Sequence, residues 1–202
     1  MPLPTYLKSF LLVRKLLGKE RVYSIVVSQY IRVIYGLGAE EKLHWSIVVI
    51  TDERNLKGHI YQIVTGGPGS IRNGTTWEMT TSDKASLYKS SKCLGGVRIG
   101  SVREGQMDSL DKVSGSRGFI LAQRSSSRLT HISQAIRRNI PVPKSKDWNC
   151  RDWVMECIET MKEYGWADRR LCRQEDLFPA MKQASALTAQ LECQTVIALD
   201  DA

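Results

Sequence analysis

Hydrophobic positions follow two different periods along this chain. In the first half, short runs rich in β-branched and aromatic residues predict strands. These runs cover residues 22–27, 30–35, 44–50 and 59–64, with shorter ones at 76–80 and 94–102. The polar stretch TDERNLKG at 51–58 is typical of a turn, so residues 44–64 are predicted to form a β-hairpin. The GGPGS stretch at 66–70 predicts a loop.

The last third of the chain has a helical period. From Cys150 the apolar residues recur at positions 150, 153, 154, 157, 158 and 161, which predicts an amphipathic helix that starts at Cys150. Asn149 or Asp147 is placed to cap its first turn. Pro141 and Pro143 end an earlier helix, and the tail from 194 is expected to be frayed. The other predicted helices are residues 5–17, 128–138 and 175–192.

These elements predict an α+β fold. We expect an antiparallel sheet of about four to six strands packed by helices, with Cys150 opening the central helix against the sheet. With 202 residues, the chain is long enough for one full core, so a single domain spanning 1–202 is expected.

Positive charge is concentrated near the predicted Cys150 helix. The net charge is +8, and residues 112–151 hold nine Lys or Arg against one acid, Asp147. Such a surface can bind phosphates of a polyanion, although it can equally serve only to keep the protein in solution. The residues expected to bind transfer RNA or another phosphate are Arg124, Arg128, Arg137, Arg138, Lys144 and Lys146.

The five cysteines include no CxxC pair, and the three histidines show no metal-ligand spacing. We therefore expect no metal, no cofactor and no disulfide framework. The longest apolar run near the N-terminus, residues 10–13, lies between basic residues. It predicts neither a membrane span nor a secretory signal, so a reducing, cytoplasmic location is expected.

Cys150 is the candidate nucleophile. A helix N-terminus favours the thiolate form of cysteine, which is the reactive form. His44, at the start of an apolar strand, is the candidate base, and His59 is the candidate third member that would orient its ring. Gln62 or Glu78 is an alternative third member. The structural alternative is that Cys150, like Cys157, simply belongs to the apolar stripe of its helix.

The order of motifs resembles a known family. An HW strand, a turn, a GHxYQI strand and a distant WNCxxWV helix start are similar to the circularly permuted branch of the papain-like NlpC superfamily. This branch includes the lecithin:retinol acyltransferase-like proteins. The resemblance implies that Cys150 forms an acyl intermediate, with His44 and His59 as its partners. It covers about residues 40–160. The separation of His44 and His59 is longer than is usual in that family.

A narrower resemblance involves PVPxxxxWNCxxWV and points to fungal arginine-containing cyclodipeptide synthases, which take aminoacyl groups from transfer RNA. It implies an aminoacyl-tRNA donor and a small-molecule or peptide acceptor. A thiol amidase or peptidase and a non-catalytic nucleic-acid- or protein-binding module are the alternatives. An arginyl side chain would need a carboxylate such as Glu78. The candidate substrate-binding residues are Glu78, Gln62, Trp77, Asn149 and Trp148.

Overall fold

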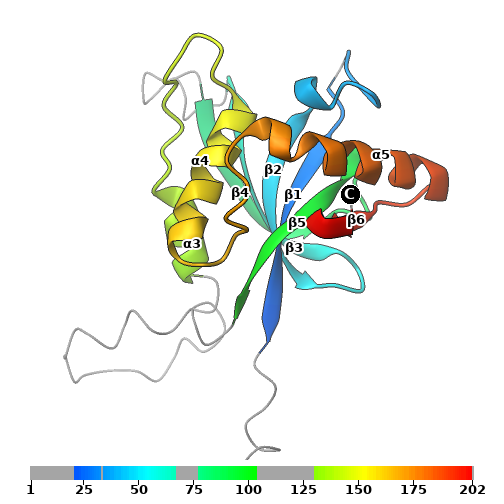
Figure 1. The fold of residues 1–202 in the computed structure, drawn as a ribbon, viewed down its shortest axis with the longest axis horizontal. Coiled ribbons are helices and arrows are strands. Elements are labelled where there is room, and N and C mark those ends of the chain that lie inside the picture. The colour runs from blue at the N-terminus through cyan, green and yellow to red at the C-terminus, as the bar shows by residue number, and fades with distance from the viewer. Residues whose placement is uncertain (1–20, 33, 67–76, 104–129, 202) are drawn as a thin grey trace, which may run out of the picture.

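A computed structural model describes residues 21–32, 34–66, 77–103 and 130–201 of the chain. The predicted helix at 5–17, most of the predicted loop at 66–70, and the candidate phosphate ligands Arg124 and Arg128 lie outside these ranges. Within them, the α+β prediction is confirmed: one six-stranded sheet is packed by helices (Figure 1).

The sheet has the strand order β4-β3-β2-β1-β5-β6. Neighbouring strands are antiparallel except for β5 and β6, which run parallel. The hairpin predicted at 44–64 is confirmed as the pair β2 and β3. The strands are β1 (Val22–Tyr30), β2 (His44–Asp52), β3 (Lys57–Thr65), β4 (Trp77–Ser86), β5 (Cys93–Arg103) and β6 (Val196–Ala198).

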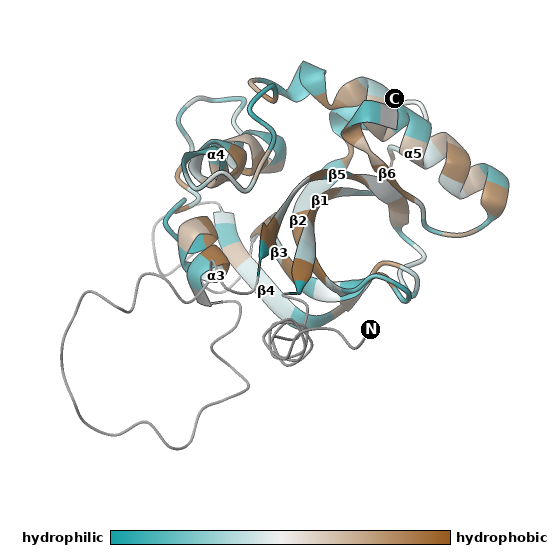
Figure 2. Ribbon diagram, turned by 60° about the horizontal axis from the view of Figure 1, so that its bottom comes forward, coloured by the Kyte–Doolittle hydropathy of each residue, from teal (hydrophilic) through white to brown (hydrophobic). Residues whose placement is uncertain are grey.

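The described helices all lie outside the strongly curled sheet (Figure 2). They are α3 (Thr130–Arg137), α4 (Cys150–Glu163) and α5 (Phe178–Leu191), with short 3-10 helices η1 (Glu40–Lys42), η5 (Gln174–Asp176) and η6 (Leu199–Asp201). The three predicted helices within the described ranges are therefore confirmed, with shifted ends. Pro179 in the first turn of α5 explains why that helix begins later than the apolar pattern indicated.

Each face of the sheet buries a different apolar cluster because side chains alternate along a strand. Trp45, Ile47 and Val49 of β2 point toward the helices and join the main core. Val48 and Ile50 point to the opposite face, inside the curl, and join a smaller cluster. Because both faces of β2 are buried, its sequence is an almost continuous apolar run.

Two sequence predictions are wrong. Residues 30–35 are not a strand as predicted: β1 ends at Tyr30, and among the described residues that follow, Arg32 and Tyr35 form an isolated bridge. The apolar side chains of this segment, Ile31 and Ile34, are exposed and have no sheet face to cover. The tail from 194 is not frayed, because β6 adds to the sheet edge beside β5 and buries Ile197.

Candidate active site

Cys150 is the first residue of α4, and Asn149 caps that helix. The side-chain oxygen of Asn149 accepts a hydrogen bond from the backbone N–H of Arg151 at 3.0 Å. The backbone N–H of Asn149 in turn donates to the Asp152 carboxylate at 2.8 Å, which completes a capping box. The apolar stripe of α4 holds the helix against β2 and β3, so the cap fixes the Cys150 thiol beside the sheet.

His44 is the first residue of β2 and meets Gln62 of β3. Nε2 of the His44 ring lies 3.1 Å from Oε1 of Gln62. The antiparallel register pairs Ile47 with Tyr61, which puts residues 44 and 62 on the same face in a diagonal relationship. A hydrogen bond from Nε2–H to Gln62 leaves Nδ1 as the ring nitrogen that can accept the thiol proton of Cys150.

Three cysteine thiols are buried, and their surroundings shift their pKa values in different directions. Burial raises the pKa of Cys93 to about 11 and raises that of Cys157 well above the usual thiol value. Burial is also the largest influence on Cys150 and raises its pKa. It is outweighed by hydrogen bonding and charge from His44, the backbone N–H of Trp45 and the charge of Arg32, which together lower the Cys150 pKa to about 7. Cys150 is therefore the buried thiol poised to ionise near neutral pH.

Arg32 contacts the sulfur directly. This residue follows β1 in the segment that leads to η1, and its Nη2 donates to Cys150 Sγ at 3.3 Å. The Cys150 side chain is 0% exposed, so Arg32 and His44 are among the groups that cover it. A substrate can reach the sulfur only if a covering side chain moves.

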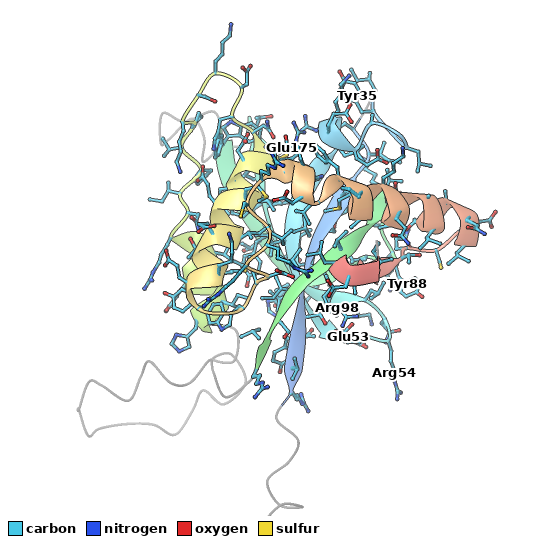
Figure 3. All side chains as sticks on the ribbon, in the orientation of Figure 1. Tyr35, Glu53, Arg54, Tyr88, Arg98 and Glu175 are labelled. Carbon is cyan, nitrogen blue, oxygen red and sulfur yellow. The ribbon has the colours of Figure 1, made fainter. Side chains whose placement is uncertain are left out.

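A second arginine supports the same region. The Arg151 guanidinium donates to the backbone oxygen of Leu43 at 3.3 Å and to the Gln174 side chain at 3.0 Å. Gln174 also donates to Asp152 at 2.6 Å, so η5 is tied to the first turn of α4. Glu175, the next residue of η5, is labelled near this helix end in Figure 3. Arg151 thus joins the strand that carries His44 to the helix that carries Cys150.

His59 does not lie with His44. It pairs with Val49, five residues along β2 from His44, which corresponds to roughly 16 Å of strand. Burial lowers the pKa of His59, opposed by the charge of Asp83 on β4. His59 instead lines a surface pocket of about 330 Å³ with Tyr61, Asp83 and Arg137. The residue that the structure places against His44 is Gln62, one of the alternatives considered from the sequence.

The other candidate substrate-binding residues have varied positions. Glu78 is half-buried on β4 and shares a sheet face with Gln62, since Val64 pairs with Glu78 and Gln62 with Thr80. Trp148 is buried, forms an edge contact with Trp77 at 5.7 Å between ring centroids, and donates from Nε1 to Glu156. The amide of Asn149 is used by the helix cap, its nitrogen donating to the Asp147 backbone.

The four described basic candidates are exposed. Arg137 and Arg138 lie at the end of α3, where they donate to Thr81 and to the Tyr164 hydroxyl, respectively. Lys144 forms an ion pair with Glu156 at 2.9 Å. Lys146 lies four residues before Cys150. Arg138 thus lies by the C-terminal end of α4 and Arg137 by β4, whereas Lys144 and Lys146 belong to the segment that leads to the N-terminus of α4.

Sequence reasoning missed Arg32 and the backbone of Trp45. Arg32 falls within a run that was predicted as a strand, and no motif distinguishes it from any other basic residue. The backbone N–H of Trp45 lowers the Cys150 pKa because of where it lies, and a backbone group leaves no mark in the sequence. The backbone N–H of Arg151 is bound to the Asn149 side chain and is therefore not free to stabilise an oxyanion. The N–H of Cys150 has no hydrogen-bond partner among the described residues, as is usual at the first position of a helix.

No grouping of three or more potential metal ligands occurs in the part of the chain that the structure describes. None of the described helices has the length and apolar content that crossing a bilayer requires.

The fold and site define an α+β protein with a Cys–His–Gln cluster at the junction of a capped helix and a sheet. Residues 31–168 match the model of a family of unknown function, DUF6540. The match covers more than half of the chain, which therefore belongs to this family. The matched region contains Arg32, His44, Gln62 and Cys150. No curated protein and no solved structure matches the chain.

Proposed function

We propose that this protein is a papain-like, cysteine-dependent acyl transferase that forms an acyl-Cys150 intermediate. The observation that carries the proposal is the contrast between Cys150 and the other buried thiols. Burial, and then the negative charge of Glu156, raise the pKa of Cys157, whereas His44, Trp45 and Arg32 hold that of Cys150 at about 7 against the effect of burial. A buried cysteine used only for packing needs no such partners.

The mechanism follows from the arrangement. Nδ1 of His44 accepts the thiol proton, and the Cys150 thiolate attacks an acyl carbonyl to form a carbon–sulfur bond. His44 returns the proton to the leaving group as its bond to the acyl carbon breaks. An amine or water then attacks the thioester and gives its proton to His44, the carbon–sulfur bond breaks, and Cys150 leaves as the thiolate, which regains its proton from His44. Gln62 holds the ring through Nε2, and the unpartnered N–H of Cys150 is available to the oxyanion.

For the acyl donor, we propose aminoacyl-tRNA as the more specific possibility. Its support is a set of exposed basic side chains: Arg137 and Arg138 at the end of α3, and Lys144 and Lys146 in the segment before Cys150. Phosphate contacts from such side chains give sequence-independent affinity for RNA.

The test is intact-protein mass spectrometry after incubation with a pool of charged transfer RNAs. The wild type should gain the mass of one aminoacyl group, and Cys150→Ala should gain none. Cys157→Ala is the matched control, since it removes another buried thiol of the same helix and should still form the adduct. An adduct that persists in Cys150→Ala would overturn the whole proposal. If transfer RNA gives no adduct but simple activated esters acylate Cys150 alone, only the RNA donor is ruled out.

A further inference from the structure

The contact between Arg32 and the Cys150 sulfur has a chemical consequence for the substrate. Nη2 of Arg32 lies 3.3 Å from Sγ, and this is the single hydrogen bond of the Arg32 side chain among the described residues. No described carboxylate forms an ion pair with Arg32. The charge partner of this half-buried guanidinium is therefore the nucleophile itself.

Positive charge exceeds negative charge around the thiolate. His44 and Arg32 both act on Cys150, and Arg151 lies close enough to be affected by the charges of Cys150 and Arg32. Asp152 and Glu41 act on Arg151, and Asp152 is further engaged by the Asn149 backbone and Gln174. The thiolate of Cys150 thus interacts with two positively charged side chains, His44 and Arg32. The nearby carboxylates interact instead with Arg151 and with the groups of the helix cap.

Acylation removes the partner of Arg32. In the acyl-enzyme the sulfur belongs to a neutral thioester, which is a poor acceptor for a guanidinium. An unpaired charge in a half-buried site is costly, so the acylated state is favoured when the acyl group itself supplies an anion. Because Arg32 lies within hydrogen-bonding distance of the sulfur, that anion must lie within a few bonds of the acyl carbon. A carboxylate matches the planar donor pair of a guanidinium.

We propose that Arg32 is a specificity-determining residue and that the acyl group transferred to Cys150 carries a carboxylate close to its reacting carbon. The incoming carboxylate takes the Arg32 guanidinium from the sulfur. This exchange uncovers the fully buried thiolate and positions the reacting carbon at the same time. No bond to Arg32 is made or broken, and its proton stays in place. This inference rests on the proposed nucleophilic role of Cys150.

The test compares two alkylating reagents that differ in charge. Iodoacetate carries a carboxylate on its reacting carbon, and iodoacetamide is its neutral counterpart. Both form the same carbon–sulfur bond to the Cys150 thiolate and release iodide. The ratio of their rate constants is independent of how much thiol is ionised, so it isolates recognition of the carboxylate. Labelling is followed by peptide mass spectrometry, with the exposed Cys172 in the same molecule as an internal reference.

In Arg32→Gln, the iodoacetate-to-iodoacetamide ratio at Cys150 should fall about tenfold, because a charge partner adjacent to the reacting carbon is lost. Arg32→Lys should keep most of the preference. Arg54→Gln removes the same charge from the exposed turn after β2, which Figure 3 shows at the opposite end of the molecule from Tyr35, and should leave the ratio unchanged. The ratio at Cys172 should be the same in all variants.

An unchanged ratio in a folded Arg32→Gln protein overturns the carboxylate proposal and leaves the nucleophilic role of Cys150 intact. If neither reagent labels Cys150 in the native wild type, both proposals fall. Should Arg32→Gln not fold, the wild type alone provides the test: the iodoacetate-to-iodoacetamide ratio should be higher at Cys150 than at the exposed Cys172. Equal ratios at the two cysteines overturn the carboxylate proposal.

Discussion

The His44 ring and the Gln62 side-chain amide meet across two neighbouring strands: His44 Nε2 lies 3.1 Å from Gln62 Oε1, although the two residues are 18 positions apart in the chain. The register of β2 and β3 produces this contact, and the same register carries His59 away along the sheet. Gln62 therefore holds the ring through Nε2, which leaves Nδ1 as the nitrogen that can accept the thiol proton of Cys150. Gln62, and not His59, is therefore expected to orient the His44 ring, and substitution of each residue tests this.

Gln62→Leu should slow alkylation of Cys150 by iodoacetamide about tenfold at neutral pH, because the His44 ring loses the partner that holds its orientation. His59→Gln is the matched control, and its rate should stay close to that of the wild type. The measurement is a stopped-flow or quenched labelling rate at one pH. The reverse outcome, with His59→Gln slow and Gln62→Leu normal, would show that the structure assigns the wrong third member.

The rate of Cys150 alkylation should rise with pH through about 7 and level off above it, because only the thiolate reacts and the Cys150 pKa is lowered to about 7. His44→Gln removes the strongest of the influences that lower this pKa, so burial should dominate and the midpoint should move to higher pH. At pH 7 the variant should react at least about tenfold more slowly. A midpoint that stays near 7 in His44→Gln would exclude His44 as the partner of Cys150.

Asn149→Ala should destabilise the protein by about 1 kcal/mol, the usual cost of losing a helix cap. The N–H of Arg151 loses its 3.0 Å acceptor at the end of the helix that carries Cys150. Urea unfolding measures the change, and Asn149→Asp is the control that keeps the cap acceptor. Asn149→Ala with undiminished stability would indicate that the cap does not hold this end of α4 in place.

Gly100→Ala should destabilise the protein by about 3 kcal/mol, since a close backbone contact has no room for an added methyl group. A Cβ at Gly100 of β5 would lie 1.9 Å from the backbone oxygen of Trp166, which follows α4. Gly36→Ala is the control: nothing lies within 4 Å of its added Cβ, and its stability should change by less than about 0.5 kcal/mol. Thermal unfolding of the two variants, side by side, distinguishes this contact from a general intolerance of alanine.

The local pattern of apolar and polar residues was sufficient to predict much of the fold. The apolar period from Cys150 predicted α4 and its start, because helical amphipathicity and the Asn149 cap are both local properties. The β-branched runs likewise predicted β2 and β3. The strand predicted at 30–35 was wrong because β-propensity describes the preference of a residue and does not say whether a neighbouring strand is present to pair with. β6 was missed because its three residues are ordered by pairing with β5, far away in the chain.

The sequence by itself determined that a cysteine stands at the start of an amphipathic helix and that a histidine begins an apolar strand. Both facts follow from side-chain type and spacing along the chain. Only the tertiary structure decided which groups surround the sulfur. Strand register selected Gln62 over His59, and the connection after β1 delivered Arg32 to 3.3 Å from Sγ. These contacts depend on pairing and packing between distant segments, which no local pattern encodes.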